Sequence, residues 1–172
     1  MDTGYIQIYT GDGKGKTTAA LGLALRAFGA GYRTFIGQFM KGRHYSELDA
    51  VLSIPFIEIE QFGGEDCITC DQVDEQHIRL AEQGLERISS IFEERRHTVV
   101  VMDEIFVAIW FSLLTEKRVM ELVLSKPDQV ELVMTGRRAG RQFIDHADLV
   151  TEMREVKHYY TRGITARKGI EM

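Results

Sequence analysis

Apolar residues along the chain fall into short continuous runs and into longer runs with a period of three to four residues. The short runs are rich in β-branched and aromatic residues, which is typical of strands covered on both faces of a sheet. They predict strands at residues 5–10, 33–39, 56–59, 98–102, 131–135 and 149–153.

The longer periodic runs predict helices between these strands, at residues 17–28, 71–94, 105–114 and 116–124. Within residues 71–94, one apolar face is formed by Ile78, Ala81, Leu85, Ile88 and Phe92. This alternation predicts an α/β fold with a mostly parallel central sheet and helices on both faces. In such sheets ligands bind at the carboxyl ends of the strands, so we expect the functional residues there.

Composition narrows the class of protein. With 172 residues, of which 44% are hydrophobic and 27% charged, the chain predicts a single globular domain over residues 1–172 and excludes a disordered or fibrous protein. The 21 basic and 26 acidic residues give a net charge of −5, which argues against a protein that coats nucleic acid. The sequence shows no membrane span, no signal peptide and only two cysteines, so we expect a cytoplasmic protein.

A glycine-rich segment follows the first predicted strand and leads directly into the first helix. It consists of Gly11, Asp12, Gly13, Lys14, Gly15, Lys16, Thr17 and Thr18. Three glycines in five residues allow the backbone N–H groups to form a concave nest, and the helix adds its positive end. We therefore expect this loop to bind the polyphosphate of ATP, with Lys16 on the phosphates and Thr17 as a ligand of Mg²⁺.

The loop departs from the usual spacing G-x-x-x-x-G-K-[ST] at its first position. Counting back from Gly15 places Thr10 there, so the loop is one residue tighter from its first glycine, Gly11, and carries an additional Lys14. We expect this loop to hold phosphates in a register different from that of an ordinary ATPase.

Acidic and basic residues follow two further strands. Asp103 and Glu104 end a run of valines, a pattern typical of a carboxylate that holds Mg²⁺ directly or through water. Alternatively, Asp103 caps the next helix and Glu104 is solvated, but the nearby phosphate loop favours the metal role for both. Arg137 follows the strand at residues 131–135, where it either grips phosphate as a planar fork or belongs to an ordinary basic surface loop.

Five segments together resemble a known family, the phosphate-loop type of ATP:corrinoid (cob(I)alamin) adenosyltransferase. They are TGDGKGKTT at residues 10–18, QFMKG at 38–42, VVVMDE at 99–104 and TGR at 135–137. The fifth is residues 157–171, which begin with KH and end with GIE. The resemblance implies a P-loop NTPase-like fold and transfer of the 5′-deoxyadenosyl group of ATP to the cobalt of a reduced corrinoid, cob(I)alamin or cob(I)yrinic acid a,c-diamide, with release of triphosphate. It also implies catalytic roles for Lys16, Glu104 and Arg137. ATP is reported to lie reversed in the loop of this family, which is consistent with the shifted register.

The resemblance carries further expectations about partners. It implies a homodimer and an electron-donor flavoprotein. In some members an N-terminal arm covers the active site, whereas here the first strand begins near Tyr5 and we expect no arm. In those members aromatic residues after the third strand press on the corrinoid; the matching stretch here is residues 61–70, with Phe62 as the candidate.

Several alternatives stay open. A phosphate-loop kinase acting on a small molecule, or a non-catalytic ATP-binding regulatory protein, would share the loop and the acids, although neither explains the similarity near the carboxyl end. Cys67 and Cys70 are either part of a zinc or redox site or reduced thiols in a loop. His158 is either a ligand of cobalt or a hydrogen-bonding surface residue.

Overall fold

A parallel sheet forms the centre of the computed structural model, which describes residues 2–66 and 68–171. Over these residues the sheet has six strands in the order β3-β2-β4-β5-β1-β6, and every pairing is parallel. The strands are β1 (Ile6–Thr10), β2 (Thr34–Phe39), β3 (Ile57–Phe62), β4 (Val99–Asp103), β5 (Glu131–Thr135) and β6 (Leu149–Glu152). All six predicted strands are confirmed, but β3 continues to Phe62 where the pattern predicted an end at residue 59.

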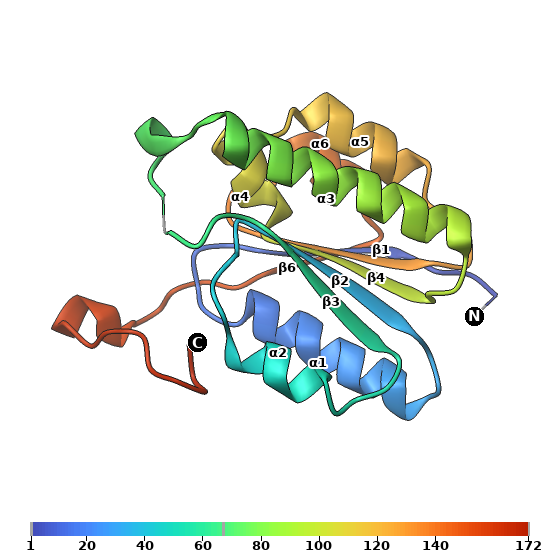
Figure 1. Ribbon diagram of the computed structural model, residues 1–172, viewed down its shortest axis with the longest axis horizontal. Coiled ribbons are helices and arrows are strands. Elements are labelled where there is room, and N and C mark those ends of the chain that lie inside the picture. The colour runs from blue at the N-terminus through green and yellow to red at the C-terminus, as the bar shows by residue number, and fades with distance from the viewer. Residues whose placement is uncertain (1, 67, 172) are drawn as a thin grey trace.

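Helices cover both faces of this sheet, as predicted (Figure 1). One face carries α1 (Lys16–Gly29) and α2 (Ser46–Val51), and the other carries α3 (Glu75–Glu94), α4 (Ile105–Trp110), α5 (Glu116–Leu124) and α6 (Arg141–His146). Short 3-10 helices, η1 and η2, span Cys70–Gln72 and Tyr159–Arg162. The pattern did not predict α2 and α6. Among the described helices, none is long and apolar enough to cross a membrane.

Helix α3 packs against the sheet through the apolar face that the sequence pattern predicts. Its predicted apolar face is buried from Ala81 to Phe92, whereas Ile78 in its first turn remains 39% exposed. At Gly84 the helix approaches the sheet so closely that a Cβ atom would lie 2.7 Å from the ring of Phe39 and 2.9 Å from that of Phe62. The glycine therefore sets the distance between α3 and the sheet.

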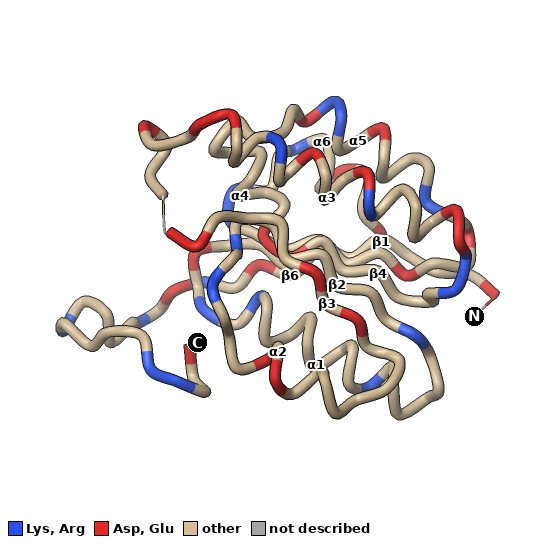
Figure 2. The backbone as a smooth tube through the Cα atoms, in the orientation of Figure 1, with Lys and Arg blue, Asp and Glu red and all other residues tan. Residues whose placement is uncertain are grey.

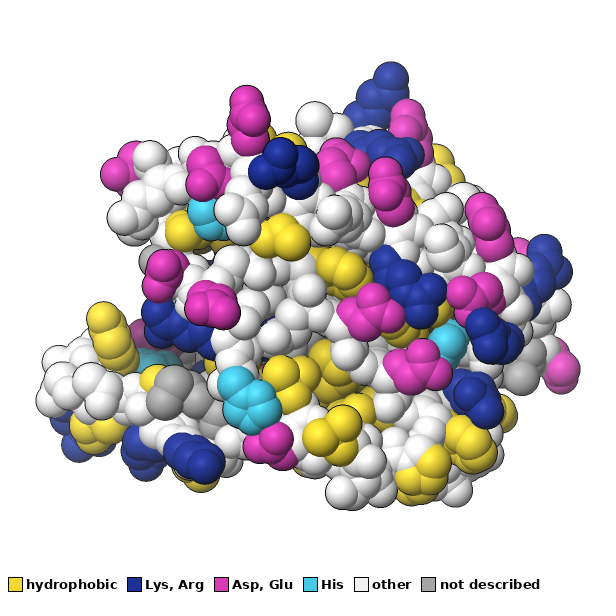
Figure 3. Space-filling model, in the orientation of Figure 1, with side chains coloured by type: hydrophobic (Ala, Val, Ile, Leu, Met, Phe, Trp, Pro, Cys, Tyr) yellow, Lys and Arg dark blue, Asp and Glu magenta, His cyan; other side chains and the backbone are white. Residues whose placement is uncertain are grey.

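Because the strands are parallel, their carboxyl ends meet at one edge of the sheet, where residues of both charges lie (Figure 2). The segment after β6, residues 153–171, runs along this edge, and we call it the strap (Figure 1). The N–H of Gly13 donates a hydrogen bond of 2.7 Å to the carbonyl oxygen of Met153, which attaches the strap to the glycine-rich loop. In the space-filling view the strap forms a lobe beside the body of the molecule (Figure 3).

Candidate active site

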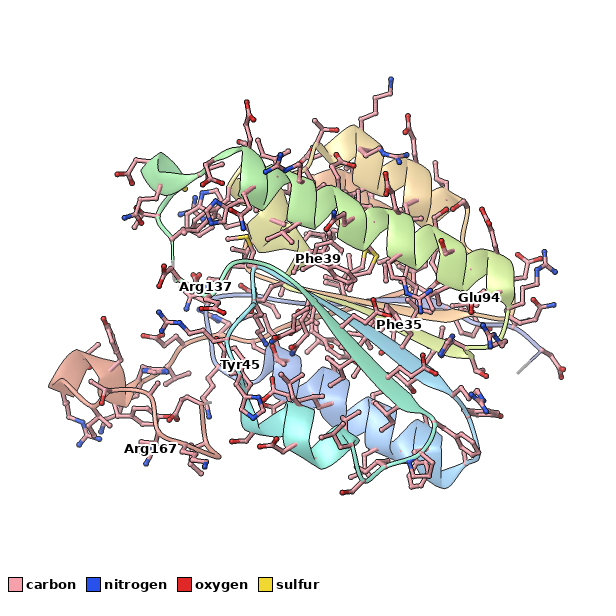
Figure 4. The ribbon with its side chains drawn as sticks, in the orientation of Figure 1. Phe35, Phe39, Tyr45, Glu94, Arg137 and Arg167 are labelled. Carbon is pink, nitrogen blue, oxygen red and sulfur yellow. The ribbon has the colours of Figure 1, made fainter. Side chains whose placement is uncertain are left out.

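A cavity of about 510 Å³ lies at the carboxyl edge of the sheet. The glycine-rich loop and the start of α1 form one wall, and the strap forms another through His158 and residues 169–171. Lys41, residues 45–47, Glu104 and Arg137 complete it. Arg137 and Tyr45 both lie at this edge, on different elements (Figure 4).

The backbone of the loop requires glycine at several positions. Gly11 and Gly15 have φ angles of 96° and 121°, which side chains rarely adopt. At Gly13 a Cβ atom would lie 2.7 Å from the carbonyl oxygen of Met153. Helix α1 begins directly after Gly15 without a side-chain cap, so its first N–H groups remain available to an anion.

Lys16 lies across this loop. Its Nζ donates to the carbonyl oxygens of Gly11 and Gly13 at 2.8 and 2.7 Å, and the residue is only 7% exposed. Burial lowers the pKa of Lys16, and Glu104 acts in the opposite direction. The ammonium group is thus held inside the ring of backbone groups that would surround a phosphate.

Asp103 connects the start of α1 to β5 and to the turn after β2. Its Oδ1 accepts hydrogen bonds from the hydroxyl groups of Thr17 at 2.8 Å and Thr135 at 2.7 Å, and its Oδ2 accepts from Lys41 Nζ at 2.8 Å. Asp103 makes no helix cap, because α4 has Glu104 at its N-cap position. The alternative interpretation of Asp103 as a cap is therefore wrong, and the carboxylate instead orients the Thr17 hydroxyl.

Glu104 points into the same cavity. Its backbone is left-handed, with a φ of 61°, and its N–H donates to Thr135 Oγ1 at 2.9 Å. Burial is the main reason why the pKa of Glu104 is raised, and the neighbouring Asp103 adds to it, whereas Lys41, Lys16 and Arg137 oppose it. Glu104 is thus not the solvated residue of the alternative interpretation.

Lys14, Lys41 and Arg137 bring three more cations to the cavity. Lys14 Nζ donates to the carbonyl oxygen of Ile170 at 2.9 Å and lies 3.4 Å from a carboxylate oxygen of Glu171. The guanidinium group of Arg137 lies 3.8 Å from Asp12 and is half exposed.

Lys41 is the most strongly held of the three. Burial is the largest single influence and lowers its pKa, but the attraction of Asp103, Glu47 and Glu104 outweighs burial and the pKa is raised.

The predicted site residues on the loop and at the ends of β4 and β5 are brought together, but Phe62 is not. Phe62 is in β3 rather than in the loop after it, 8% exposed, and its ring centroid lies 5.9 Å from that of Phe39. Its side chain therefore faces the core and does not line the cavity.

The predicted cysteine pair is only partly described. Cys70 is exposed, Cys67 lies outside the described residues, and the described part of the chain holds no cluster of three or more His, Cys, Asp or Glu suited to a metal.

The sequence pattern predicted no role for Lys41, Tyr45 or Glu171, which all line the cavity. Two signals pointed to Lys41: it lies two residues after the end of β2, and it belongs to the segment QFMKG that resembles the family.

The donor set fits Mg²⁺. This ion prefers hard oxygen ligands and is usually held by one or two carboxylates together with substrate phosphates. The Thr17 hydroxyl and the Glu104 carboxylate offer such oxygens within the cavity. Asp103 already accepts from Thr17, Thr135 and Lys41, so it fits as a support for the ligands rather than as a ligand.

Comparison with known proteins agrees with this geometry. Residues 2–172 match the protein family described as ATP:corrinoid adenosyltransferase BtuR/CobO/CobP. A corrinoid adenosyltransferase of Sinorhizobium sp is 32% identical over 99% of this chain and 81% of its own length. Those of Pseudomonas aeruginosa and Escherichia coli K12 are also 32% identical over 99% of this chain, and 84% and 86% of their lengths are covered. The chain therefore belongs to the ATP:corrinoid adenosyltransferase family.

Proposed function

We propose that this protein transfers the 5′-deoxyadenosyl group of ATP to the cobalt of a reduced corrinoid and releases triphosphate. One observation carries the proposal. In a chain that matches the family from residue 2 to 172, the tight phosphate loop, its buried lysine and the Thr17–Asp103 pair converge on one cavity.

The reaction places specific demands on the protein. The electron pair of cobalt(I) attacks C5′, the bond between C5′ and oxygen breaks, and triphosphate leaves with the electron pair of that bond. Because the reduced cobalt is itself the nucleophile, the protein needs no activated serine or cysteine. Its tasks are to align the two reactants and to stabilise the charge that develops on the leaving triphosphate.

The residues around the cavity suit these tasks. Loop N–H groups, the first turn of α1 and Lys16 surround the position of the phosphates, and Lys14 and Arg137 lie at its rim. We propose that Thr17 and Glu104 hold Mg²⁺, which neutralises phosphate charge when bound. Asp103 orients Thr17 by accepting its hydroxyl proton.

Further parts of the proposal concern the assembly. We propose one domain over residues 1–172, a homodimer in which a second copy helps to cover the large corrinoid, an electron-donor flavoprotein and a cytoplasmic location. The side chains of Lys14 and Arg137 at the rim of the cavity are 40% and 51% exposed, which supports a partner over its mouth, and the exposed free thiol of Cys70 supports a reducing compartment.

The decisive experiment is anaerobic incubation with ATP, Mg²⁺ and chemically reduced corrinoids. We expect a light-sensitive cobalt–carbon product and one triphosphate for each adenosyl group transferred. Formation of ADP would instead identify a kinase, and ATP binding without turnover would identify a regulatory protein. Either result overturns the proposal.

Lys16→Ala provides the matching variant. Removing the buried ammonium group from the loop should slow transfer by about 100-fold or more, because a preorganised donor to the developing charge is lost. Circular dichroism should remain that of the parent protein. The control is Lys117→Ala, which removes a similar charge from the exposed face of α5. Near-normal turnover by Lys16→Ala would contradict the assignment of the phosphate loop.

A further inference from the structure

Residues 38–42 form the last part of β2 and the turn that follows it at the cavity, and no role has yet been assigned to this turn. Met40 has a left-handed φ of 61°, which is uncommon for a residue with a side chain. Two close backbone contacts hold this turn: a Cβ atom at Gly63 would lie 2.4 Å from the backbone nitrogen of Lys41, and one at Gly42 would lie 2.3 Å from the carbonyl oxygen of Gly63. The chain is thus bent and packed against the loop after β3, and this arrangement turns Lys41 towards β4.

The ammonium group of Lys41 lies beside side chains of the proposed phosphate site. Its Nζ lies 2.8 Å from Asp103 Oδ2, 3.5 Å from Thr17 Oγ1 and 3.9 Å from Glu47. The side chains of Lys41 and Asp103 are 14% and 1% exposed, so their ion pair is largely shielded from water. Such a pair is costly to break by removing one partner, because the other charge stays buried.

The two oxygens of Asp103 have separate tasks. Oδ2 accepts from Lys41, and Gln38 Nε2 lies 3.5 Å away on the same side. Oδ1 accepts the hydroxyl protons of Thr17 and Thr135. Since the proton of Thr17 is used in this bond, its oxygen keeps a lone pair for a cation in the cavity beside the long contact of 3.5 Å from Lys41 Nζ.

Thr135 extends the same network to Glu104. Its hydroxyl oxygen accepts the backbone N–H of Glu104 at 2.9 Å while its proton goes to Asp103. Asp103 therefore fixes the hydroxyl of Thr17 and, through Thr135, the backbone from which the Glu104 carboxylate projects. Lys41 is the counter-ion of this buried carboxylate and holds it in place.

We propose that Lys41 is a positioning residue for the divalent cation that accompanies ATP, acting through Asp103 on Thr17 and Glu104 rather than on the phosphates directly. The inference rests on the proposed function, because it assumes that the cavity takes ATP with Mg²⁺. Loss of the ammonium group leaves Asp103 buried beside Glu104 without its ion-pair partner, so the carboxylate is no longer held in place. Thr17 then loses the acceptor that orients it.

The test measures ATP binding with and without the metal. For Lys41→Met, the Mg²⁺ concentration that gives half of the metal-dependent increase in ATP affinity should rise about tenfold or more, the usual effect of losing a group that orients metal ligands. The dissociation constant of ATP in EDTA should stay close to that of the parent protein. Lys14→Met is the comparison, since a lysine that contacts phosphate directly should weaken binding equally with and without Mg²⁺.

A second variant separates positioning from loss of folding. Lys41→Met combined with Asp103→Asn removes both charges of the pair, and the amide oxygen still accepts from Thr17. We expect this double variant to recover most of the Mg²⁺ response. Thermal unfolding of each variant in EDTA reports the stability of the fold independently.

Different failures have different meanings. If the parent protein binds no ATP, the proposed function and this inference both fall. If the parent responds to Mg²⁺ but Lys41→Met responds equally well, or loses ATP affinity equally in EDTA, only the positioning role is overturned. A double variant as defective as Lys41→Met also overturns it.

Discussion

Asp103 and Glu104 are neighbours in the sequence, but β4 ends between them and gives them different surroundings. Asp103 is fully buried and accepts hydrogen bonds from the start of α1, from β5 and from the turn after β2. Glu104 turns through a left-handed backbone into the cavity, where burial raises the pKa of its carboxyl group. Asp103 organises the hydrogen bonds of the site, whereas Glu104, which we propose as a ligand of Mg²⁺, is buried at a cost to the stability of the fold.

Glu104→Gln should therefore stabilise the protein in the absence of metal. Because the folded pKa is raised, the folded state binds more protons than the unfolded state between the ordinary and the raised value, and stability falls as the pH rises through that interval. At neutral pH glutamine removes this penalty, and we expect a free energy of unfolding higher by about 0.5–2 kcal/mol. Urea unfolding in EDTA at pH 7 measures the difference.

The same substitution should cost function. ATP binding by Glu104→Gln should require more Mg²⁺, because a charged oxygen ligand is lost. The stability difference should shrink when the pH falls below the ordinary carboxyl pKa of about 4.3, where the glutamate is protonated in both states. A variant less stable than the parent at neutral pH, or an unchanged Mg²⁺ requirement, would contradict the proposed role of Glu104 as a buried cation ligand.

At the scale of elements, the strands were predictable because buried parallel strands appear as short apolar runs. Helices α2 and α6 were not, since α2 buries no residue and α6 buries only Phe143, so neither shows an apolar stripe. Phe62 was expected in a loop because Glu58 and Glu60 interrupt the apolar run of β3, so the pattern predicted that the strand ends at residue 59. As an edge strand, β3 leaves Glu58 exposed, and polar positions then interrupt the pattern.

The site was predictable where one segment contains the chemistry, as in the glycine-rich loop. It was not predictable where the chemistry depends on neighbours in the sheet. Strands β2 and β4 are adjacent, with Gln38 in register with Asp103, and this pairing places Lys41 on the carboxylate. No spacing along the chain indicates which strands will pair, so the role of Lys41 required the fold.

Two glycines in helices test whether packing or propensity decides stability. Gly84→Ala in α3 should destabilise the protein by about 1–3 kcal/mol, because the new methyl group meets the rings of Phe39 and Phe62. Gly22→Ala in α1 has no atom within 4 Å of the new methyl group and should stabilise by about 0.5–1 kcal/mol. Urea unfolding of both variants measures the two effects. Changes of the same sign would refute the close approach of α3 to the sheet.

At the scale of the whole molecule, the strap near the end of the chain contacts the glycine-rich loop near its beginning. It starts at β6, passes Gly13, and returns to the cavity at residues 169–171. Glu171 anchors this return: it accepts from the Arg167 side chain and the Tyr159 hydroxyl, and it lies 3.4 Å from Lys14 of the loop. The bonds from Arg167 and Tyr159 are the main reason why the pKa of Glu171 is lowered.

Glu171→Gln should release the end of the strap from the loop. The backbone N–H of Arg167 donates to a carboxylate oxygen of Glu171 at 2.9 Å, so its hydrogen exchange should accelerate in the variant, whereas that of Gly13, bonded to Met153, should not. Because the folded pKa of Glu171 is lowered, the anchor forms above the ordinary carboxyl pKa and is lost only as the pH falls through the lowered value, so it should persist in mildly acidic solution. Glu155→Gln, an equal change of charge at an exposed position of the strap, is the control. Unchanged exchange at Arg167 in Glu171→Gln would show that this carboxylate does not hold the strap, and an equal acceleration in Glu155→Gln would show that general charge holds it.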